Sequence, residues 1–227
     1  MTRSATADGA RDLGAVERIY RSWGHHPRLY AAQDLVTFLG RHRTIRRRAV
    51  EAMGVGRGAR VLEVACGTGR NFPYVEDAIG PEGTLVGLDY SQEMLDAARG
   101  VVARHRWSNI RLVHGDAAEL DVGSEPFDGV LCVLGFSAMP GHFAALQRCH
   151  AVLRPGGRLS VCDARLFSGR LSKLNPLVRS IYVPATGWNP ERDVVRDMER
   201  VFGNVTAESF NAGTFFVAWA EKREGTT

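Results

Sequence analysis

Long apolar runs are missing from this sequence. None of its 227 residues lies in a run that approaches the roughly 18 consecutive apolar residues of a membrane-spanning helix. The opening segment, MTRSATADGARDLG, lacks the apolar core of a signal peptide, so we expect a cytoplasmic protein with about 12 disordered residues at its start. The hydrophobic fraction of 44% and the charged fraction of 24% are typical of a soluble globular chain with one large domain.

Cysteine pairs with the CxxC spacing of a zinc or redox motif are also absent. The four cysteines are Cys66, Cys132, Cys149 and Cys162. Cys132 and Cys162 stand inside apolar runs, where a thiol serves as a small core residue. We therefore expect reduced, buried cysteines and no metal site.

Acidic residues are absent from two basic stretches. The first, GRHRTIRRRA (40–49), holds five arginines. The second, 164–188, contains the basic residues Arg165, Arg170, Lys173 and Arg179. A solvated helix face is one interpretation of the first stretch, and contact with a phosphate-bearing substrate or an anionic membrane surface is the other. The net charge of +4 is small and no recognition motif accompanies it, so we expect no nucleic-acid partner.

From residue 59 onward, apolar runs rich in Val and Leu alternate with amphipathic segments. The runs that predict strands are 59–65, 83–90, 109–115, 127–135 and 157–164. The segments that predict helices are 91–105 with Ser91 as N-cap, 141–153, and 189–202 with Asn189 as N-cap. Two later runs, 204–210 and 213–222, are joined by the turn NAG. The pattern predicts an α/β fold with a mostly parallel sheet, helices on both faces and an antiparallel C-terminal strand pair.

A third glycine is missing from the turn in VLEVACGTGRNFP (61–73). Gly67 and Gly69 follow the first predicted strand, where a tight turn lets a ligand approach bare backbone. A diphosphate-binding GxGxxG motif would have its third glycine where this sequence has Phe72. The turn therefore favours a ligand without a diphosphate, and an NAD-dependent oxidoreductase becomes the less favoured alternative.

Two carboxylates stand at the ends of the next predicted strands. Asp89 ends the second strand, where a carboxylate accepts hydrogen bonds from both hydroxyls of a ribose. Asp116 lies just beyond the third strand, where it would accept a bond from an adenine amino group. The alternatives are that Asp89 caps the following helix and that Asp116 forms a turn. Because the carboxyl ends of parallel strands share one edge of a sheet, the two together predict a nucleoside pocket.

Several motifs in this order resemble those of the class I S-adenosylmethionine-dependent methyltransferases. They are VLEVACGTG, LVGLDYS, GDAAEL, FDGVLCVLGFS and LRPGGRL, within residues 59–163. The resemblance implies a Rossmann-like, seven-stranded sheet and S-adenosyl-L-methionine as cofactor. A looser likeness, through VTFLGRHRTIRRRAVEAMGV and the C-terminal end, points to the branch of quinone-biosynthesis and phosphatidylethanolamine methyltransferases.

The resemblance also implies a set of cofactor-binding residues. Glu63 would help to hold the cofactor's ammonium group, and Asp89 would bind the ribose hydroxyls. Tyr90 and Met94 would flank the adenine. Asp116 and Ala117 would contact the adenine edge. The full set is Glu63, Ala65, Gly67, Thr68, Gly69, Asp89, Tyr90, Met94, Asp116, Ala117 and Val133.

The residue pattern predicts two parts in the chain. Residues 1–53 would form an N-terminal helical lid, broken near Gly24 and Pro27, and residues 54–227 the methyltransferase domain. The insert 164–188 would cover the acceptor, with packing against the sheet edge as the alternative.

The predicted function is methyl transfer by direct displacement to nitrogen, oxygen or carbon of a small, apolar or lipid-like acceptor. The candidate catalytic residues are His142 and Tyr30, although a plain surface or helix-end histidine is the favoured interpretation of His142, and helix packing accounts for Tyr30 equally well. One alternative is a phosphatidylethanolamine N-methyltransferase in peripheral contact with an anionic membrane; another is a non-catalytic, cofactor-binding partner subunit. Methylation of nucleic-acid amino groups is disfavoured, because LGFSAM follows the fourth strand in place of an Asn/Asp-Pro-Pro-Tyr/Phe motif.

Overall fold

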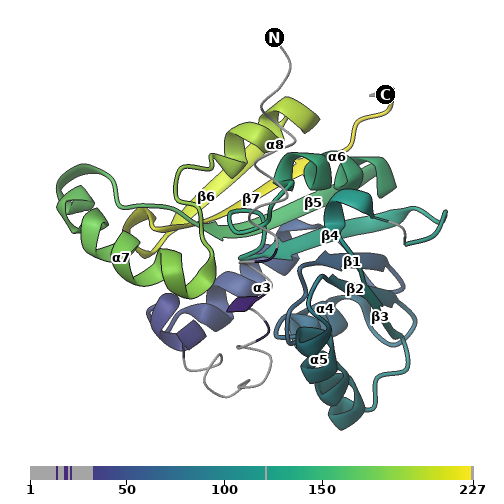
Figure 1. The fold of residues 1–227 in the computed structure, drawn as a ribbon. Helices are drawn as coiled ribbons and strands as arrows, with labels where there is room; N and C mark the ends of the chain where they lie inside the picture. The colour runs from purple at the N-terminus through teal and green to yellow at the C-terminus, as the bar shows by residue number, and fades with distance from the viewer. Residues whose placement is uncertain (1–13, 15–17, 20, 22–32, 121, 226–227) are drawn as a thin grey trace.

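The computed structural model describes residues 14, 18, 19, 21, 33–120 and 122–225, which form the coloured ribbon of Figure 1. The strands are β1 (Arg60–Val64), β2 (Thr84–Asp89), β3 (Ile110–His114), β4 (Phe127–Val133), β5 (Leu153–Ala164), β6 (Val205–Phe210) and β7 (Phe215–Glu221). The helices are α3 (His42–Ala52), α4 (Phe72–Ile79), α5 (Gln92–His105), α6 (His142–Val152), α7 (Asn175–Thr186) and α8 (Val194–Phe202). Short 3-10 helices are η1 (Ala117–Glu119), η2 (Gly169–Leu174) and η3 (Asn211–Gly213).

One sheet contains all these strands, in the order β3-β2-β1-β4-β5-β7-β6. Neighbouring strands from β3 to β5 are parallel, whereas β7 is antiparallel to both β5 and β6. The predicted Rossmann-like sheet and its antiparallel C-terminal pair are therefore confirmed. The chain runs outward from β1 to β3 and then returns to β4 on the other side of β1. Open α/β sheets bind their ligands beyond the carboxyl ends of the strands at such a reversal.

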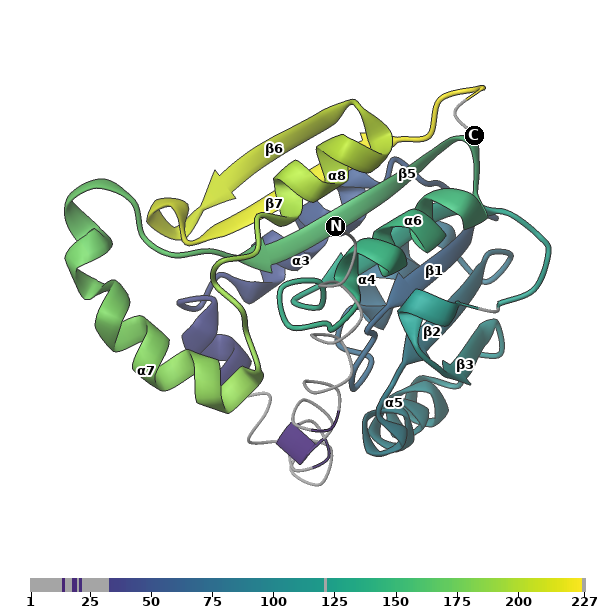
Figure 2. The same cartoon turned by 45° about the horizontal axis from the view of Figure 1, so that its top comes forward.

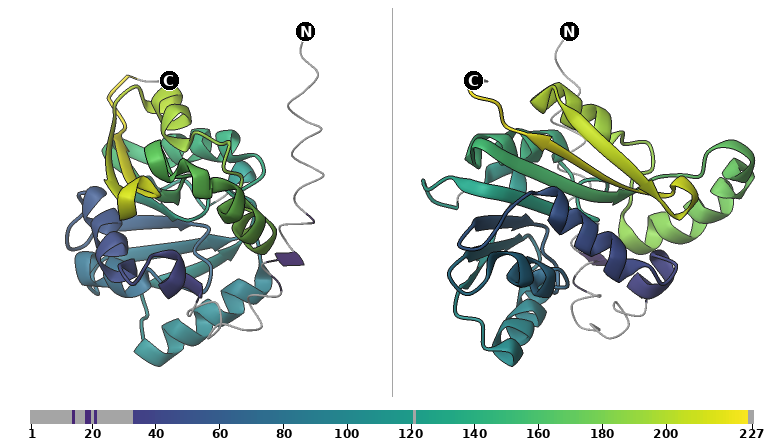
Figure 3. Two further views of the ribbon diagram at one scale, coloured as in Figure 1. Left: turned by 90° about the vertical axis from the view of Figure 1, so that its left-hand side faces the viewer. Right: turned by 180° about the vertical axis from the view of Figure 1, so that it is seen from behind.

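A hydrophobic core lies on each face of the sheet. On one face, α6 and α8 contribute Leu146, Cys149, Met198 and Phe202 to a core shared with the strands. On the other face, α3, α4 and α5 pack against the sheet, and α3 crosses in front of it in the right panel of Figure 3. Strand side chains alternate between the two cores, since Val61 belongs to one and Leu62 to the other.

The last predicted helix begins later than expected. The Asn189 N-cap is wrong: α8 starts at Val194, and the side chain of Asp193 caps it by accepting from the Arg196 N–H. Asn189 Oδ1 instead accepts from the Glu191 N–H, in a turn that precedes the helix. The tertiary structure explains this delay, because Arg192 in the same turn bonds to the loop after β4.

The arginine cluster of α3 does not form a single solvated face. Arg43 and Arg47 are exposed, but Arg46 is buried and Arg48 donates to the carboxylate of Glu208 on β6. The interpretation as a solvated face is therefore wrong for Arg46. One member of the cluster is a core residue, and it requires a buried partner.

The four cysteines are free and buried, as predicted. Burial raises the pKa of the Cys149 thiol to about 12 and that of Cys162 further, so both remain thiols at neutral pH. Over the described ranges, none of the helices has the length and apolar character needed to cross a membrane. The predicted breaks at Gly24 and Pro27 and the predicted disorder at the start lie outside the described residues.

Candidate functional site

The turn after β1 uses its two glycines for different reasons. Both have positive φ angles, 55° at Gly67 and 76° at Gly69. A Cβ atom on Gly67 would enter open space, whereas one on Gly69 would lie 2.7 Å from the ring of Phe72. Gly67 therefore keeps a ligand-accessible surface bare, and Gly69 makes room for a core side chain.

The Phe72 ring fills the space beneath this turn. It is fully buried, and it also lies 3.1 Å from the position of a Cβ on Gly87 in β2. An aromatic ring thus occupies the position of the missing third glycine and wedges between the turn and the neighbouring strand.

Asp89 links the end of β2 to the turn after β1. Its Oδ2 accepts from the Gly67 N–H at 2.7 Å, and its Oδ1 accepts from the Ser91 N–H at 2.9 Å. Burial raises the pKa of this carboxyl, while the two N–H bonds lower it. The cap of α5 is Ser91, whose hydroxyl accepts from the Met94 N–H, so Asp89 is not the helix cap.

A pocket opens at the carboxyl ends of β1, β2 and β4. Its volume is about 100 Å³. The predicted cofactor residues that line it are Ala65, Gly67, Asp89, Tyr90, Asp116, Ala117 and Val133. The lining also includes Leu88, Leu134, Gly135, Ala138, Met139 and Pro140, and Gly115 beside Asp116. Glu63, Thr68, Gly69 and Met94 lie outside this lining, and all four are buried. We name this space the first pocket.

Asp116 borders the first pocket and also shapes the chain there. Its Oδ1 accepts from the Ala118 N–H at 2.8 Å and so caps η1. The turn-forming role of Asp116 is therefore present. Tyr90 is 42% exposed on the pocket wall, and its carbonyl oxygen lies 2.8 Å from Nε2 of His114.

A buried polar chain lies behind the glycine turn. Glu63 Oε1 accepts from Asn71 Nδ2 at 2.6 Å, and Asn71 Oδ1 accepts from Arg46 Nη1 at 2.5 Å. Arg46 Nη2 in turn donates to Asp34 Oδ1 at 2.6 Å, and Arg70 approaches the other Asp34 oxygen at 2.8 Å. Burial raises the pKa of Glu63 to about 8, so this carboxyl is mostly protonated at neutral pH.

A second pocket lies beside the first and encloses about 240 Å³. Its walls come from segment 33–39, the ends of β4 and β5, the helix α7 and the start of β7. Its lining residues include Asp34, Asp163, Arg165, Val178, Tyr182 and Trp188. The two pockets share Leu134 and Ala138, so they meet at the end of β4.

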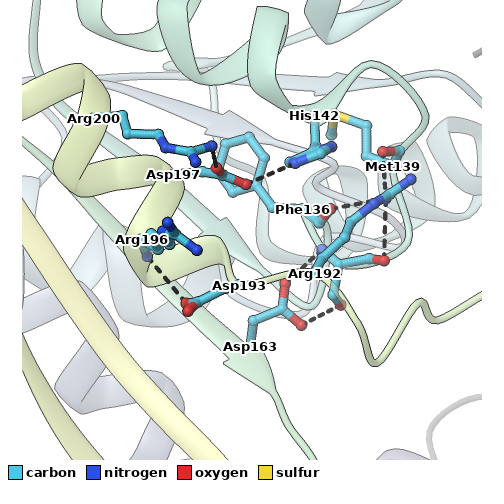
Figure 4. A network of polar contacts seen from close by, with 10 residues as sticks. Phe136, Met139, His142, Asp163, Arg192, Asp193, Arg196, Asp197 and Arg200 are labelled. Atoms are coloured by element: carbon cyan, nitrogen blue, oxygen red, sulfur yellow. Dashed lines mark hydrogen bonds and ion pairs between the residues drawn. The ribbon is translucent and has the colours of Figure 1, made fainter. Parts of the chain in front are cut away.

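The loop after β4, which contributes residues to both pockets, is held by polar contacts from the end of β5 and from the turn before α8 (Figure 4). Asp163 at the end of β5 accepts from the Ser137 N–H and hydroxyl at 2.9 and 2.5 Å. The Arg192 guanidinium donates to the carbonyl oxygens of Phe136, Ser137 and Met139 at 3.2, 3.1 and 2.6 Å. Leu134 has a φ of 59°, a conformation that costs a non-glycine residue about 1–2 kcal/mol and that these bonds help to maintain.

Of the two candidate catalytic residues, one is described. His142 begins α6, and its Nε2 lies 3.0 Å from Asp197 Oδ2 on α8 (Figure 4). Burial lowers the pKa of His142, and the ring lies outside the lining of both pockets. Tyr30 lies outside the described residues. A catalytic role for either residue stays a prediction.

The sequence analysis did not single out Asp163, Arg192 or Asp34. Asp163 carried the same signal as Asp89, an acid directly at the end of an apolar strand, and was detectable on that ground. Arg192 and Asp34 show no such signal in the sequence, because their roles depend on partners distant in sequence. In the part of the chain that the structure describes, no group of three His, Cys, Asp or Glu residues is arranged to hold a metal ion.

The chain is similar in sequence to known methyltransferases. Residues 61–157 match a family model described as a methyltransferase domain. A demethylmenaquinone methyltransferase of Staphylococcus aureus is 34% identical over 146 residues, which are 64% of this chain. The match spans 59% of that relative's length.

Solved structures share the fold. A chain of the Haloferax volcanii complex with the Trm112 methyltransferase activator has a TM-score of 0.70 and 17% identity, covering 90% of this chain and 98% of that one. An arsenic(III) S-adenosylmethionine methyltransferase from Chlamydomonas reinhardtii has a TM-score of 0.59 and 21% identity, covering 74% and 65% of the two chains. At such identities the likeness concerns the fold alone.

Proposed function

We propose that this chain, whose residues 61–157 match a methyltransferase-domain model, is a class I S-adenosylmethionine-dependent methyltransferase that moves a methyl group from that cofactor to a small apolar acceptor. The observation that carries the proposal is the contact between the two pockets at Leu134 and Ala138. A donor in the first pocket and an acceptor in the second would meet at the end of β4.

The residues of the first pocket fit an adenosyl cofactor. The bare backbone of Gly67 faces open space, and Asp89 stands where ribose hydroxyls would be bound. Tyr90 and Ala117 offer an aromatic face and an apolar wall for the adenine. Glu63 is buried outside the pocket lining, and its Oε2 has no hydrogen-bond partner among the described residues, so its support of the cofactor's ammonium end is only what the family resemblance implies.

The chain's own contribution is to position the reactants and exclude water. The cofactor's sulfonium supplies a methyl group that is already electrophilic, so direct displacement requires alignment more than acid–base chemistry. Holding an acceptor in near-attack geometry is worth on the order of 7–11 kcal/mol. The bonds from Arg192 and Asp163 to the loop after β4 would keep the meeting point of the two pockets rigid.

The second pocket favours an apolar acceptor with a polar end. Leu134, Val178 and Phe215 give it apolar walls, and Arg165 and Asp163 are among its charged groups. A quinone-related compound is the first candidate, since the relative from Staphylococcus aureus is a demethylmenaquinone methyltransferase. A phenol or activated carbon would benefit from a base; Tyr30 remains a candidate, whereas His142 lies outside the lining of both pockets and is the less favoured one. The insert 164–188, which contains η2 and α7, would act as the acceptor's cover.

Incubation with methyl-labelled S-adenosylmethionine tests the proposal. The panel of acceptors would contain a reduced naphthoquinone with an apolar side chain, phosphatidylethanolamine and a simple amine, with mass identification of the product. We expect label in the quinone-related compound, and much less label with the Asp89→Ala variant at a cofactor concentration that does not saturate it. Binding of S-adenosylhomocysteine without methylation of any acceptor would favour a non-catalytic partner subunit, and absence of such binding would overturn the proposal.

A further inference from the structure

The short helix η2 and helix α7 present exposed apolar side chains, Leu171 and Leu174 from η2 and Leu177 and Ile181 from α7. No residue of η2 or α7 is fully buried. Leu171, Leu174, Leu177 and Ile181 are exposed by 44%, 47%, 60% and 55%. A surface helix of a globular protein normally buries its apolar side chains in a core, and these four are not buried in one.

A second exposed apolar segment borders the same pocket. Leu35, Val36 and Leu39, which precede α3, are 49%, 64% and 67% exposed. This segment and α7 both line the second pocket, through Leu39 on one side and Val178 and Tyr182 on the other. Figure 2 shows α7 beside the helical segment that precedes α3. We name the seven exposed residues the apolar rim; rims of this kind mark interaction sites on soluble proteins.

Basic residues predominate beside the apolar rim, although Arg179 on α7 is paired with Glu191 at 2.5 Å, so that Arg170 and Lys173 carry the argument. From residue 164 to residue 188 there are four basic residues and no acid. Arg170 and Lys173 are exposed and alternate with Leu171 and Leu174 along η2. Leucines interleaved with basic residues are the composition of segments that lie at the interface of anionic bilayers.

We propose that the apolar rim docks on an anionic lipid surface, with the entrance of the second pocket facing the bilayer. The leucines would enter the boundary between headgroups and acyl chains, and Arg170 and Lys173 would contact lipid phosphates. A lipophilic acceptor would then reach the pocket without crossing water. This last benefit rests on the proposed methyl transfer, but the docking itself does not.

Flotation of the full chain with lipid vesicles tests the docking. We expect strong binding to vesicles with about 30 mol% phosphatidylglycerol and weak binding to pure phosphatidylcholine. Binding should weaken between about 50 and about 300 mM salt, because screening reduces the attraction of the basic residues. Equal binding to both vesicle types, or no binding at low salt, would overturn the proposal.

Two variants separate the apolar and the charged contributions. Leu177→Gln with Ile181→Gln should reduce the partition coefficient about tenfold or more, and Arg170→Gln with Lys173→Gln should reduce it severalfold on anionic vesicles only. Phe143→Gln on α6 and Arg104→Gln on α5 are matched controls, since each changes an exposed residue away from the rim. Binding of S-adenosylhomocysteine would verify that each variant is folded, and controls that weaken vesicle binding as strongly as the rim variants would contradict the proposal.

Two further measurements distinguish the remaining outcomes. If light scattering shows a dimer that becomes a monomer in the Leu177→Gln, Ile181→Gln variant, the rim is an interface between copies and the proposal is wrong. If vesicle binding is confirmed but no acceptor is methylated, docking stands and the proposed function fails. With both correct, the variant should lose methylation of a vesicle-borne acceptor and keep that of a short-chain, water-soluble analogue.

Discussion

The N–H of Gly67 donates to Oδ2 of Asp89 across 2.7 Å, and this bond joins the turn after β1 to the end of β2. The same carboxylate lines the first pocket, so one side chain both shapes the turn and faces the space proposed for the cofactor. Its replacement should therefore affect cofactor binding as well as stability.

Asp89→Ala is expected to weaken S-adenosylhomocysteine binding about tenfold or more, because hydrogen bonds to a charged group are lost. Isothermal titration calorimetry measures the change. Asp96→Ala on α5 is the matched control, because Asp96 is exposed and bonds only to its own helix through Gln92 and Arg99. Unchanged affinity in Asp89→Ala would remove the first pocket as the adenosyl site.

The two glycines of the turn should respond differently to alanine. Gly67→Ala places a methyl group in the space assigned to the cofactor, so affinity should fall while the left-handed backbone costs about 1–2 kcal/mol of stability. Gly69→Ala adds to the same strain a clash with the buried Phe72 ring, worth about 1–3 kcal/mol more. Urea unfolding and calorimetry on both variants check the difference; equal stability losses would contradict the packing role of Gly69.

Stability should depend on pH through Glu63. Its pKa rises from an ordinary 4.5 to about 8 in the folded state, so the folded protein binds the extra proton between these values. The free energy of unfolding contributed by this group therefore decreases as pH rises, by at most about 1.4 kcal/mol per pH unit, and levels off above about pH 8.

Glu63→Gln isolates this contribution, because glutamine keeps the oxygen that accepts from Asn71 Nδ2. The variant's stability relative to the original protein should increase with pH from about 5 to about 8 in urea unfolding. A constant difference over this range would mean that Glu63 is ionised in the folded protein.

Arg46 should be among the most sensitive residues of its basic cluster. It and Asp34 expose only 5% and 4% of their side chains, and removal of one partner from a buried ion pair costs about 3–5 kcal/mol. Arg46→Met should therefore destabilise strongly, whereas Arg47→Met on the exposed face should stay within about 0.5 kcal/mol. Chemical unfolding measures both, and similar values for the two variants would contradict the buried pair.

His142 can be tested against its partner Asp197. Loss of their 3.0 Å contact should cost about 1 kcal/mol of stability in either His142→Ala or Asp197→Ala. Because His142 lies outside both pocket linings, we expect the rate constant for methyl transfer to stay unchanged in both variants. A loss of rate in His142→Ala alone, with a changed pH profile, would instead identify it as the base.

The sequence by itself determined the strand pattern, the glycine turn and the carboxylate at the end of β2. These follow from local rules: short Val- and Leu-rich runs form buried parallel strands, and tight turns between strand and helix require glycine. The position of Asp89 beside Gly67 then follows from the parallel pairing of β1 with β2. The first pocket was predictable for the same reason, since parallel strands bring their carboxyl ends to one edge.

Only the tertiary structure decided which arginine of α3 is buried, where α8 begins and what surrounds the second pocket. Arg46 meets Asn71 25 residues away, and Arg192 bonds to Ser137 55 residues away, so neither role leaves a local pattern. The burial of a charge depends on a partner that folding brings from elsewhere in the chain. Periodicity describes one element at a time, whereas the second pocket is enclosed by segments that meet only in the folded chain.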